Sequence, residues 1–348
     1  MYSEEFYASI PRLTIVLGRK CNNNCFHCKQ SGILVSEEDN NHISDIVWEF
    51  LDEWSQYYLT FKDAQPRIMF WGGEPLLYFD SIVSIIDYIH SRGLRHVKYM
   101  LITNGLMLNE RMVNYFNEHD VVVSLSFDGP DEHALRPIIP SNEILKIFLC
   151  IKKREVHWCW CKKNPDLIES YKYLKNKFPN TELKPYYIHL SDGVDRSIVA
   201  FEKNEVYNFT KKAIDYIFSK DKINTLYNFF LNNSLYNYSL KEDFQENIVC
   251  NTPSIMEFNL EGVIFQCRNV NKIVAKIGDS ESKIFNFLKF KWKGTSIPLK
   301  CYSCKFYKHC RRDCPLICLN EDKTELLSCY YMKEMYQAMS DTGLMYFD

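Results

Sequence analysis

Six short strand-like segments alternate with amphipathic helical windows between residues 12 and 190, and this alternation limits the possible folds more than any other feature. Each segment is rich in β-branched or aromatic residues and is followed by apolar residues at helical spacing. The expected strands are 12–18, 67–73, 96–105, 121–129, 155–161 and 184–190. One helix per strand predicts an α/β fold, with a parallel sheet that curls into a partial (β/α)6 TIM-like barrel.

Two further regions follow the predicted barrel of residues 1–198. Residues 199–245 are rich in Tyr, Phe and Asn and lack strand alternation, which predicts a helical linker or insert. From residue 246 to 348 the apolar periodicity fades, and cysteine spacing becomes the main regularity. A weak core with many thiols is typical of a domain stabilised by metal binding.

Composition narrows the class of protein. The chain has 348 residues, 14 cysteines and a formal net charge of −2, and no segment resembles a secretory signal or a run of about 20 apolar residues. We therefore expect a cytoplasmic protein, whose thiols are more often metal ligands than disulfides. The near-zero net charge argues against nucleic acid or a membrane surface as a partner.

Three cysteines, Cys21, Cys25 and Cys28, fall in the loop after the first predicted strand. In a βα barrel this loop lies on the C-terminal face, where active sites are built. One interpretation is a zinc site completed by a ligand from elsewhere in the chain. The other is a cubane iron–sulfur cluster held at three corners, with its fourth iron open to a substrate or cosubstrate.

The ends of the next three predicted strands carry short motifs. They read "WGGEP" (71–75), "TNG" (103–105) and "SFDGP" (126–130). A glycine pair allows the backbone to approach a ligand closely, although a glycine-rich turn is the simpler interpretation. An Asn-Gly pair alone is typical of a turn.

Eight more cysteines lie near the C-terminus. A CxxC pair such as "CYSC" (301–304) is also common in zinc sites, so zinc is an alternative here. The eight are Cys250, Cys267, Cys301, Cys304, Cys310, Cys314, Cys318 and Cys329.

The CxxxCxxC loop, followed by these motifs at successive strand ends, resembles the radical SAM superfamily. The resemblance implies a [4Fe–4S] cluster on Cys21, Cys25 and Cys28, whose open iron binds the amino and carboxylate groups of S-adenosylmethionine (SAM). Reductive cleavage of SAM would give a 5′-deoxyadenosyl radical that abstracts a hydrogen atom from a C–H bond.

The same resemblance implies a set of SAM-binding residues. Phe26 is expected to pack over the cluster, the His27 backbone to meet the adenine, and Arg136 to pair with the SAM carboxylate, unless it is simply a solvated arginine. The full set of implied cofactor contacts is Phe26, His27, Gly72, Gly73, Glu74, Asn104, Ser126, Asp128 and Arg136.

The C-terminal cysteines resemble the SPASM domain, which implies two auxiliary [4Fe–4S] clusters and three clusters in all. Carried over by position, one set is Cys301, Cys304, Cys310 and Cys329, and the set nearer the barrel is Cys250, Cys267 and Cys314. The nearer cluster then has an open iron or recruits Cys318. Cys318 could equally be a small buried apolar residue.

The resemblance implies a polypeptide substrate, such as a ribosomal precursor peptide that gains a thioether or carbon–carbon cross-link, and an electron donor such as flavodoxin or ferredoxin. Sulfatase maturases of this family carry an aspartate after the second SPASM cysteine, but Arg268 follows Cys267 here. Because only twenty residues precede Cys21, a leader peptide would be bound by the barrel, by residues 199–245 or by a separate protein. A folded protein or a small molecule as substrate, and a zinc-stabilised binding protein, are the alternatives.

Overall fold

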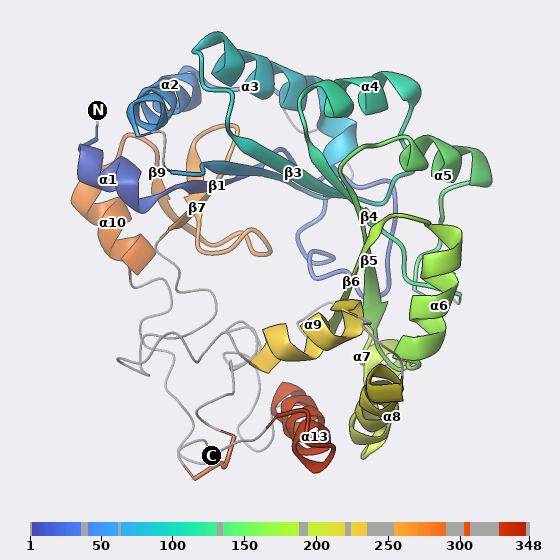
Figure 1. Cartoon of the computed structure of the whole chain (residues 1–348). Helices are drawn as coiled ribbons and strands as arrows, with labels where there is room; N and C mark the ends of the chain where they lie inside the picture. The colour runs from blue at the N-terminus through green and yellow to red at the C-terminus, as the bar shows by residue number, and fades with distance from the viewer. Residues whose placement is uncertain are drawn as a thin grey trace.

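The computed structural model describes residues 2–35, 41–61, 64–130, 135–187, 194–219, 224–234, 254–289, 303–306 and 327–345. A single curved sheet forms its centre, with the strands in the order β6-β5-β4-β3-β2-β1-β7-β8-β9 (Figure 1). The strands are β1 (Arg12–Val16), β2 (Arg67–Trp71), β3 (Lys98–Thr103), β4 (Val122–Ser126), β5 (Arg154–Trp160), β6 (Glu182–Tyr187), β7 (Ile255–Asn259), β8 (Val263–Phe265) and β9 (Ile273–Lys276). The first six are parallel to their neighbours, which confirms the predicted α/β fold with a partial barrel.

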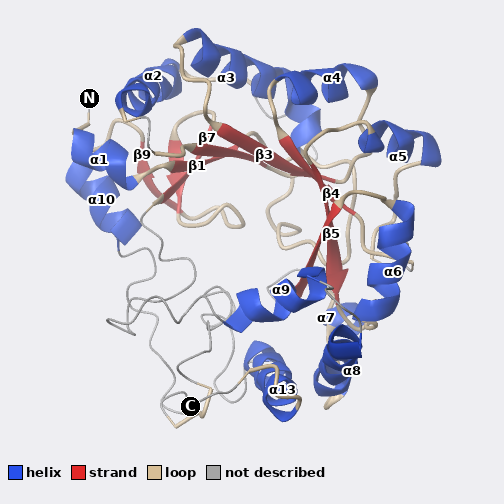
Figure 2. Cartoon of the chain, in the orientation of Figure 1, coloured by secondary structure: helices blue, strands red, loops and turns tan. Residues whose placement is uncertain are grey.

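Helices cover the outer, convex side of the curved sheet (Figure 2). In α3, four isoleucines at helical spacing are fully buried in the core between helix and sheet: Ile82, Ile85, Ile86 and Ile89. The described helices are α1 (Glu4–Ser9), α2 (Asp45–Thr60), the 3₁₀ helix η1 (Pro75–Tyr78), α3 (Phe79–Ser91), α4 (Glu110–Glu118), α5 (Asn142–Leu149), α6 (Leu167–Lys177), α7 (Arg196–Val199), α8 (Glu205–Ser219), α9 (Asn224–Ser234), α10 (Glu281–Lys289) and α13 (Leu327–Asp341). In these parts of the chain, no helix combines the length and the apolar character needed to cross a membrane.

The third part of the chain contributes to the same sheet as the barrel. Strand β7 pairs in parallel with β1, with Leu13 opposite Met256 and Ile15 opposite Phe258. The sequence did not predict this extension, because the periodicity of the region is weak. The sheet thus continues past residue 246, and the three-part division of the chain stays a prediction.

Strand β1 is consequently an interior strand, flanked by β2 and β7. Four of its five residues, 13–16, are buried. A strand buried on both faces is expected where a parallel sheet is covered on both sides. The loop that carries the three N-terminal cysteines therefore leaves a strand that is fixed from both neighbours.

Candidate cluster and cofactor site

The three cysteines lie on the loop that leaves β1, as predicted. Backbone hydrogen bonds fold this loop, including Cys28 N–H to the Cys25 carbonyl (3.1 Å) and Val35 N–H to the Arg19 carbonyl (3.2 Å). Burial raises the pKa of Cys21 to about 11 and that of Cys25 to about 12, and it also raises the pKa of Cys28. Without a bound cation the thiols are therefore neutral at pH 7, and metal binding has to displace their protons.

Each of the three sulfur atoms has an N–H donor, and two of these donors come from outside the loop. Donors of this kind stabilise thiolates in iron–sulfur sites. The pairs are Asn104 Nδ2 with Cys21 Sγ (4.0 Å), Arg136 Nη1 with Cys25 Sγ (3.4 Å), and Gln30 N with Cys28 Sγ (3.4 Å).

The donor set is compatible with a cubane cluster held at three corners. Cys21, Cys25 and Cys28 lie on one loop, and each sulfur has an N–H donor. Thiolates at separate corners of a cubane do not need to converge on one ion. The loop with Cys21, Cys25 and Cys28 therefore suits the implied [4Fe–4S] cluster.

The glycines of the "WGGEP" motif pack against the cluster loop. A Cβ atom on Gly72 would lie 2.5 Å from the Gly18 carbonyl oxygen, and one on Gly73 would lie 2.3 Å from the Lys20 carbonyl oxygen. In addition, Gly73 N–H donates to the Gly18 carbonyl (3.0 Å). The close approach that the glycines permit is to the backbone just before Cys21, whereas the sequence suggested an approach to a ligand.

Glu74 connects the end of β2 to the end of β3. Its buried carboxylate accepts hydrogen bonds from Thr103 Oγ1 (2.6 Å), Asn104 N (2.8 Å) and Leu76 N (3.0 Å). Burial raises its pKa, although these hydrogen bonds favour the charged form. The "TNG" motif is therefore more than a turn, because its backbone is held by the motif of the preceding strand.

Glu74→Gln is expected to destabilise the protein by about 1–3 kcal/mol, because the new amide group would face a backbone N–H with another donor. Thermal unfolding measures this effect. Glu143, an exposed residue in the first turn of α5, provides the control Glu143→Gln. An equal melting temperature for both variants would contradict the connecting role of Glu74.

Asn104 reaches the cluster loop with its side chain. Its amide donates to Asn22 Oδ1 (2.8 Å), and its own Oδ1 accepts from Leu106 N (3.0 Å). Ser126 occupies the last position of β4, partly buried and opposite His157. The Phe26 ring is 42% exposed, so its packing over a cluster stays a prediction.

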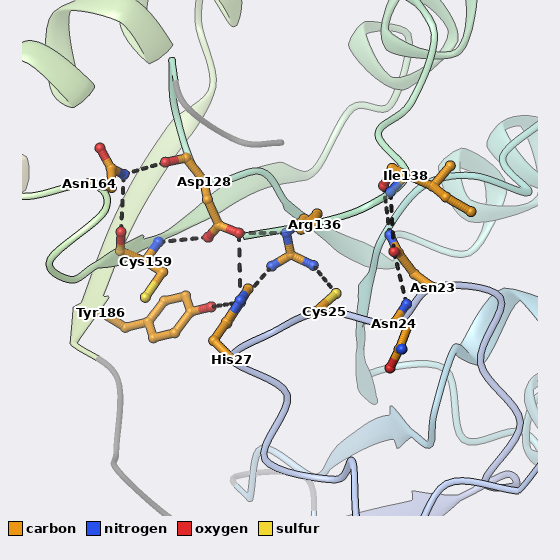
Figure 3. Close-up of polar contacts among 10 residues, drawn as sticks. All are labelled: Asn23, Asn24, Cys25, His27, Asp128, Arg136, Ile138, Cys159, Asn164 and Tyr186. Atoms are coloured by element: carbon orange, nitrogen blue, oxygen red, sulfur yellow. Dashed lines mark hydrogen bonds and ion pairs between the residues drawn. The ribbon is translucent and has the colours of Figure 1, made fainter. Parts of the chain in front are cut away.

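Arg136 joins the "SFDGP" segment to the cluster loop (Figure 3). Its Nε donates to Asp128 Oδ2 (2.5 Å), and its Nη2 lies 3.2 Å from His27 Nε2. The arginine is 6% exposed and Asp128 is 0% exposed, so the alternative of a solvated arginine is wrong. Burial raises the pKa of Asp128, but the charge and the hydrogen bond of Arg136 outweigh this effect and the net pKa is lowered.

His27 retains a buried donor. An arginine can only donate, so His27 Nε2 accepts and the ring proton lies on Nδ1. Burial lowers the pKa of His27 to about 4, which agrees with a neutral ring. Its buried Nδ1 atom has the Leu135 backbone nearby but makes no well-formed hydrogen bond among the described residues. A weakly bonded donor beside the cysteine loop suits a site for a polar cofactor.

The cluster loop also contacts the segment that carries Cys267. The Arg268 carbonyl accepts from Arg19 Nη1 (2.6 Å) and from Gln30 Nε2 (3.2 Å). Sequence reasoning missed Arg19 and Gln30, since no motif marks them. The Arg268 guanidinium binds Glu257 (3.1 Å) and lies 4.5 Å above the Trp71 ring centre.

Three of the eight C-terminal cysteines, Cys267, Cys304 and Cys329, belong to the described residues. The other five lie outside them: Cys250, Cys301, Cys310, Cys314 and Cys318. The ligand sets of the two auxiliary clusters therefore stay predictions.

Comparisons with known proteins match part of the chain to a known family. Residues 15–159 match the sequence model of the Radical SAM superfamily. The "Radical SAM cyclopropyl synthase TigE" of Paramaledivibacter caminithermalis is 26% identical over 155 residues, which cover 39% of this chain and 33% of TigE. The matches to curated relatives span between 28% and 41% of the relatives' own lengths.

Two solved structures share the fold over most of the chain. The structure of anSMEcpe with bound AdoMet has a TM-score of 0.68 at 17% identity and covers 96% of both chains. Streptococcus suis SuiB bound to the precursor peptide SuiA has a TM-score of 0.61 at 18% identity, covering 90% of this chain and 74% of SuiB. Residues 15–159 thus match the radical SAM superfamily, and these similarities support the SPASM subfamily.

Proposed function

We propose that this chain is a radical SAM enzyme that oxidatively modifies a peptide. The observation that carries the proposal is the cysteine loop after β1, in which Cys21, Cys25 and Cys28 each have an N–H donor. When bound, a [4Fe–4S] cluster and SAM supply one-electron cleavage of SAM and abstraction of a hydrogen atom from a C–H bond.

The residues of the chain position this chemistry. In the proposal the three thiolates hold the cluster, and the ends of β2, β3 and β4 surround the cofactor. Glu74 fixes the end of β3, and Asn104 connects that end to the cluster loop. The buried N–H of His27 and the polar end of β4 at Ser126 are then available to SAM. Enclosing the reaction between these strand ends excludes water from a reactive species.

A peptide substrate is supported by the fold. Both anSMEcpe, solved with a Cp18Cys peptide, and SuiB, solved with a precursor peptide, share the fold of this chain. We propose a ribosomal precursor peptide that gains a thioether link, a carbon–carbon link or another oxidative modification. A folded protein or a small molecule is the alternative substrate.

The residue after Cys267 argues against sulfatase maturation. Arg268 pairs with Glu257, and an arginine side chain is not deprotonated in proteins. It therefore cannot replace an aspartate as a base. The pairing therefore favours a peptide modification in which residue 268 does not act as a base.

We also propose two auxiliary [4Fe–4S] clusters, on the C-terminal cysteines named above, and a flavodoxin or ferredoxin as electron donor. The position of Cys267, one residue from the carbonyl that Arg19 and Gln30 bind, supports a second cluster near the first. Whether Cys318 completes that cluster can be measured as the loss of iron from a Cys318→Ala variant.

The proposal predicts about twelve irons and twelve sulfides per chain after anaerobic reconstitution. It also predicts 5′-deoxyadenosine when SAM and dithionite are added. Iron and sulfide analysis followed by chromatography of the same sample tests both. A colourless, zinc-containing protein that leaves SAM intact would contradict the proposal and favour a zinc-stabilised binding protein.

A further inference from the structure

The guanidinium of Arg136 contacts three different groups with its three nitrogens. Nε binds Asp128, Nη1 binds Cys25 Sγ at 3.4 Å, and Nη2 lies beside His27. Cys25 and His27 belong to the cluster loop, whereas Asp128 follows β4. Arg136 is thus the charged link between the loop and the wall of the barrel (Figure 3).

Asp128 gives this link a rigid support. Its Oδ1 accepts from the backbone N–H of Cys159 in β5 (2.9 Å), and its backbone carbonyl accepts from Asn164 Nδ2. Asn164 in turn donates to the Cys159 carbonyl (3.0 Å) and accepts from Ser170 Oγ (2.5 Å). The carboxylate that orients Arg136 is therefore fixed from two adjacent strand ends.

The donor to Cys25 differs in charge from the other two donors. Asn104 and the Gln30 backbone are neutral, whereas an arginine carries its positive charge at every accessible pH. Hydrogen bonds from a charged donor are about twice as strong as those from a neutral one. Arg136 is also buried, so water screens its charge poorly.

We propose that Arg136, oriented by Asp128, is a positioning residue that fixes the Cys25 corner of the first cluster and raises the reduction potential of that cluster. Reduction adds one negative charge to a cluster, and a nearby buried cation stabilises that charge. This inference rests on the proposed function. It differs from the predicted contact between Arg136 and the SAM carboxylate, which concerns cofactor affinity.

The test compares Arg136→Gln and Arg136→Lys with the wild-type enzyme. After anaerobic reconstitution, iron content shows whether the clusters assemble. A redox titration followed by electron paramagnetic resonance then reports the potential of the cluster whose signal changes when SAM is added. Arg136→Gln is expected to make reduction at least tenfold less favourable, a downward shift of about 59 mV or more. Arg136→Lys, which keeps the charge but loses the planar fork, is expected to lie between Arg136→Gln and the wild type.

Arg154→Gln is the matched control. Arg154 donates to Thr181 Oγ1 (2.9 Å) and to the Ile151 carbonyl (2.7 Å), at the opposite end of β5 from Cys159. The potential of this variant should equal that of the wild type. If Arg136→Gln fails to hold iron, the test rests on Arg136→Lys. A reduction potential of the SAM-responsive cluster in Arg136→Lys below the wild-type value then supports the inference.

Two results would overturn the inference. An Arg136 variant with full iron content and the wild-type potential shows that the cation does not tune the cluster. If such a variant loses only SAM affinity, Arg136 is a cofactor contact and the proposed function stands. A wild-type protein without a SAM-responsive cluster would instead remove the proposed function and this inference together.

Discussion

Replacing Cys25 with alanine is expected to abolish 5′-deoxyadenosine formation and to leave about eight of the twelve irons bound. The two remaining thiols, Cys21 and Cys28, cannot hold three corners of a cluster. The loss also leaves Arg136 Nη1 without its sulfur acceptor. Because the auxiliary clusters use other cysteines, the absorbance that they contribute should remain. Iron analysis and a deoxyadenosine assay on the same sample measure both effects.

Cys150→Ala is the matched control for this prediction. Cys150 is exposed just after α5, and its thiol donates to the Lys146 carbonyl (3.5 Å). This variant should keep the full iron content and the wild-type rate. Cleavage of SAM by Cys25→Ala at the wild-type rate would show that the loop after β1 does not bind the catalytic cluster.

Gly73→Ala is expected to unfold the cluster loop or prevent its assembly, at a cost of about 1–3 kcal/mol or more. The new methyl group would lie 2.3 Å from the Lys20 carbonyl oxygen and 2.9 Å from the Arg19 carbonyl oxygen. Both are backbone atoms, so no side chain can rotate away to relieve the overlap. We expect a lower melting temperature, and we expect the iron of the first cluster to be lost while the auxiliary iron remains.

Gly32→Ala separates this overlap from a general effect of glycine replacement. Gly32 belongs to the same loop, but a Cβ atom there would have no neighbour within 4 Å. Its melting temperature and iron content should therefore match those of the wild type. Equal values for Gly73→Ala would disprove the tight packing between the end of β2 and the cluster loop.

The sequence predicted the barrel because its signals are local. Period-two strands such as β3, with Tyr99 and Leu101 buried toward the helices, alternate with helices whose apolar residues follow a 3.6-residue period. All six predicted strands lie within three residues of the observed ones. The candidate residues could be placed at one face for the same reason, since the carboxyl ends of parallel strands share one face of the barrel.

Helix starts are indicated less clearly by the sequence than strands are. Asp80 and Asn164–Pro165 are acceptable capping residues by type, but α3 begins at Phe79, directly after η1, so Asp80 lies in its first turn. The cap of α6 is Asp166, which accepts from the backbone N–H groups of residues 168 and 169. Asn164 instead supports Asp128. A side chain that can serve either a helix start or a buried network is assigned by tertiary contacts.

The partners of Arg136 were beyond sequence reasoning for a similar reason. Its contacts to Cys25 and His27 cross more than one hundred residues of chain. A lone arginine eight residues after Asp128 is usually exposed. Likewise, the segment of β7 is too short and irregular to indicate that its partner is β1. Such contacts depend on how distant elements pack in the fold, and local apolar periodicity does not predict that packing.

The pairing of β7 with β1 has a consequence for how this protein can be divided. Without residues 255–259, one side of β1 would present unpaired N–H and C=O groups beside the apolar side chains of Leu13 and Ile15. Open edges of this kind join to other chains and lead to aggregation. A shortened chain that stops before β7 would therefore expose an unpaired edge of β1, the strand that leads into the cysteine loop. Any soluble catalytic fragment has to retain β7 or receive a substitute strand.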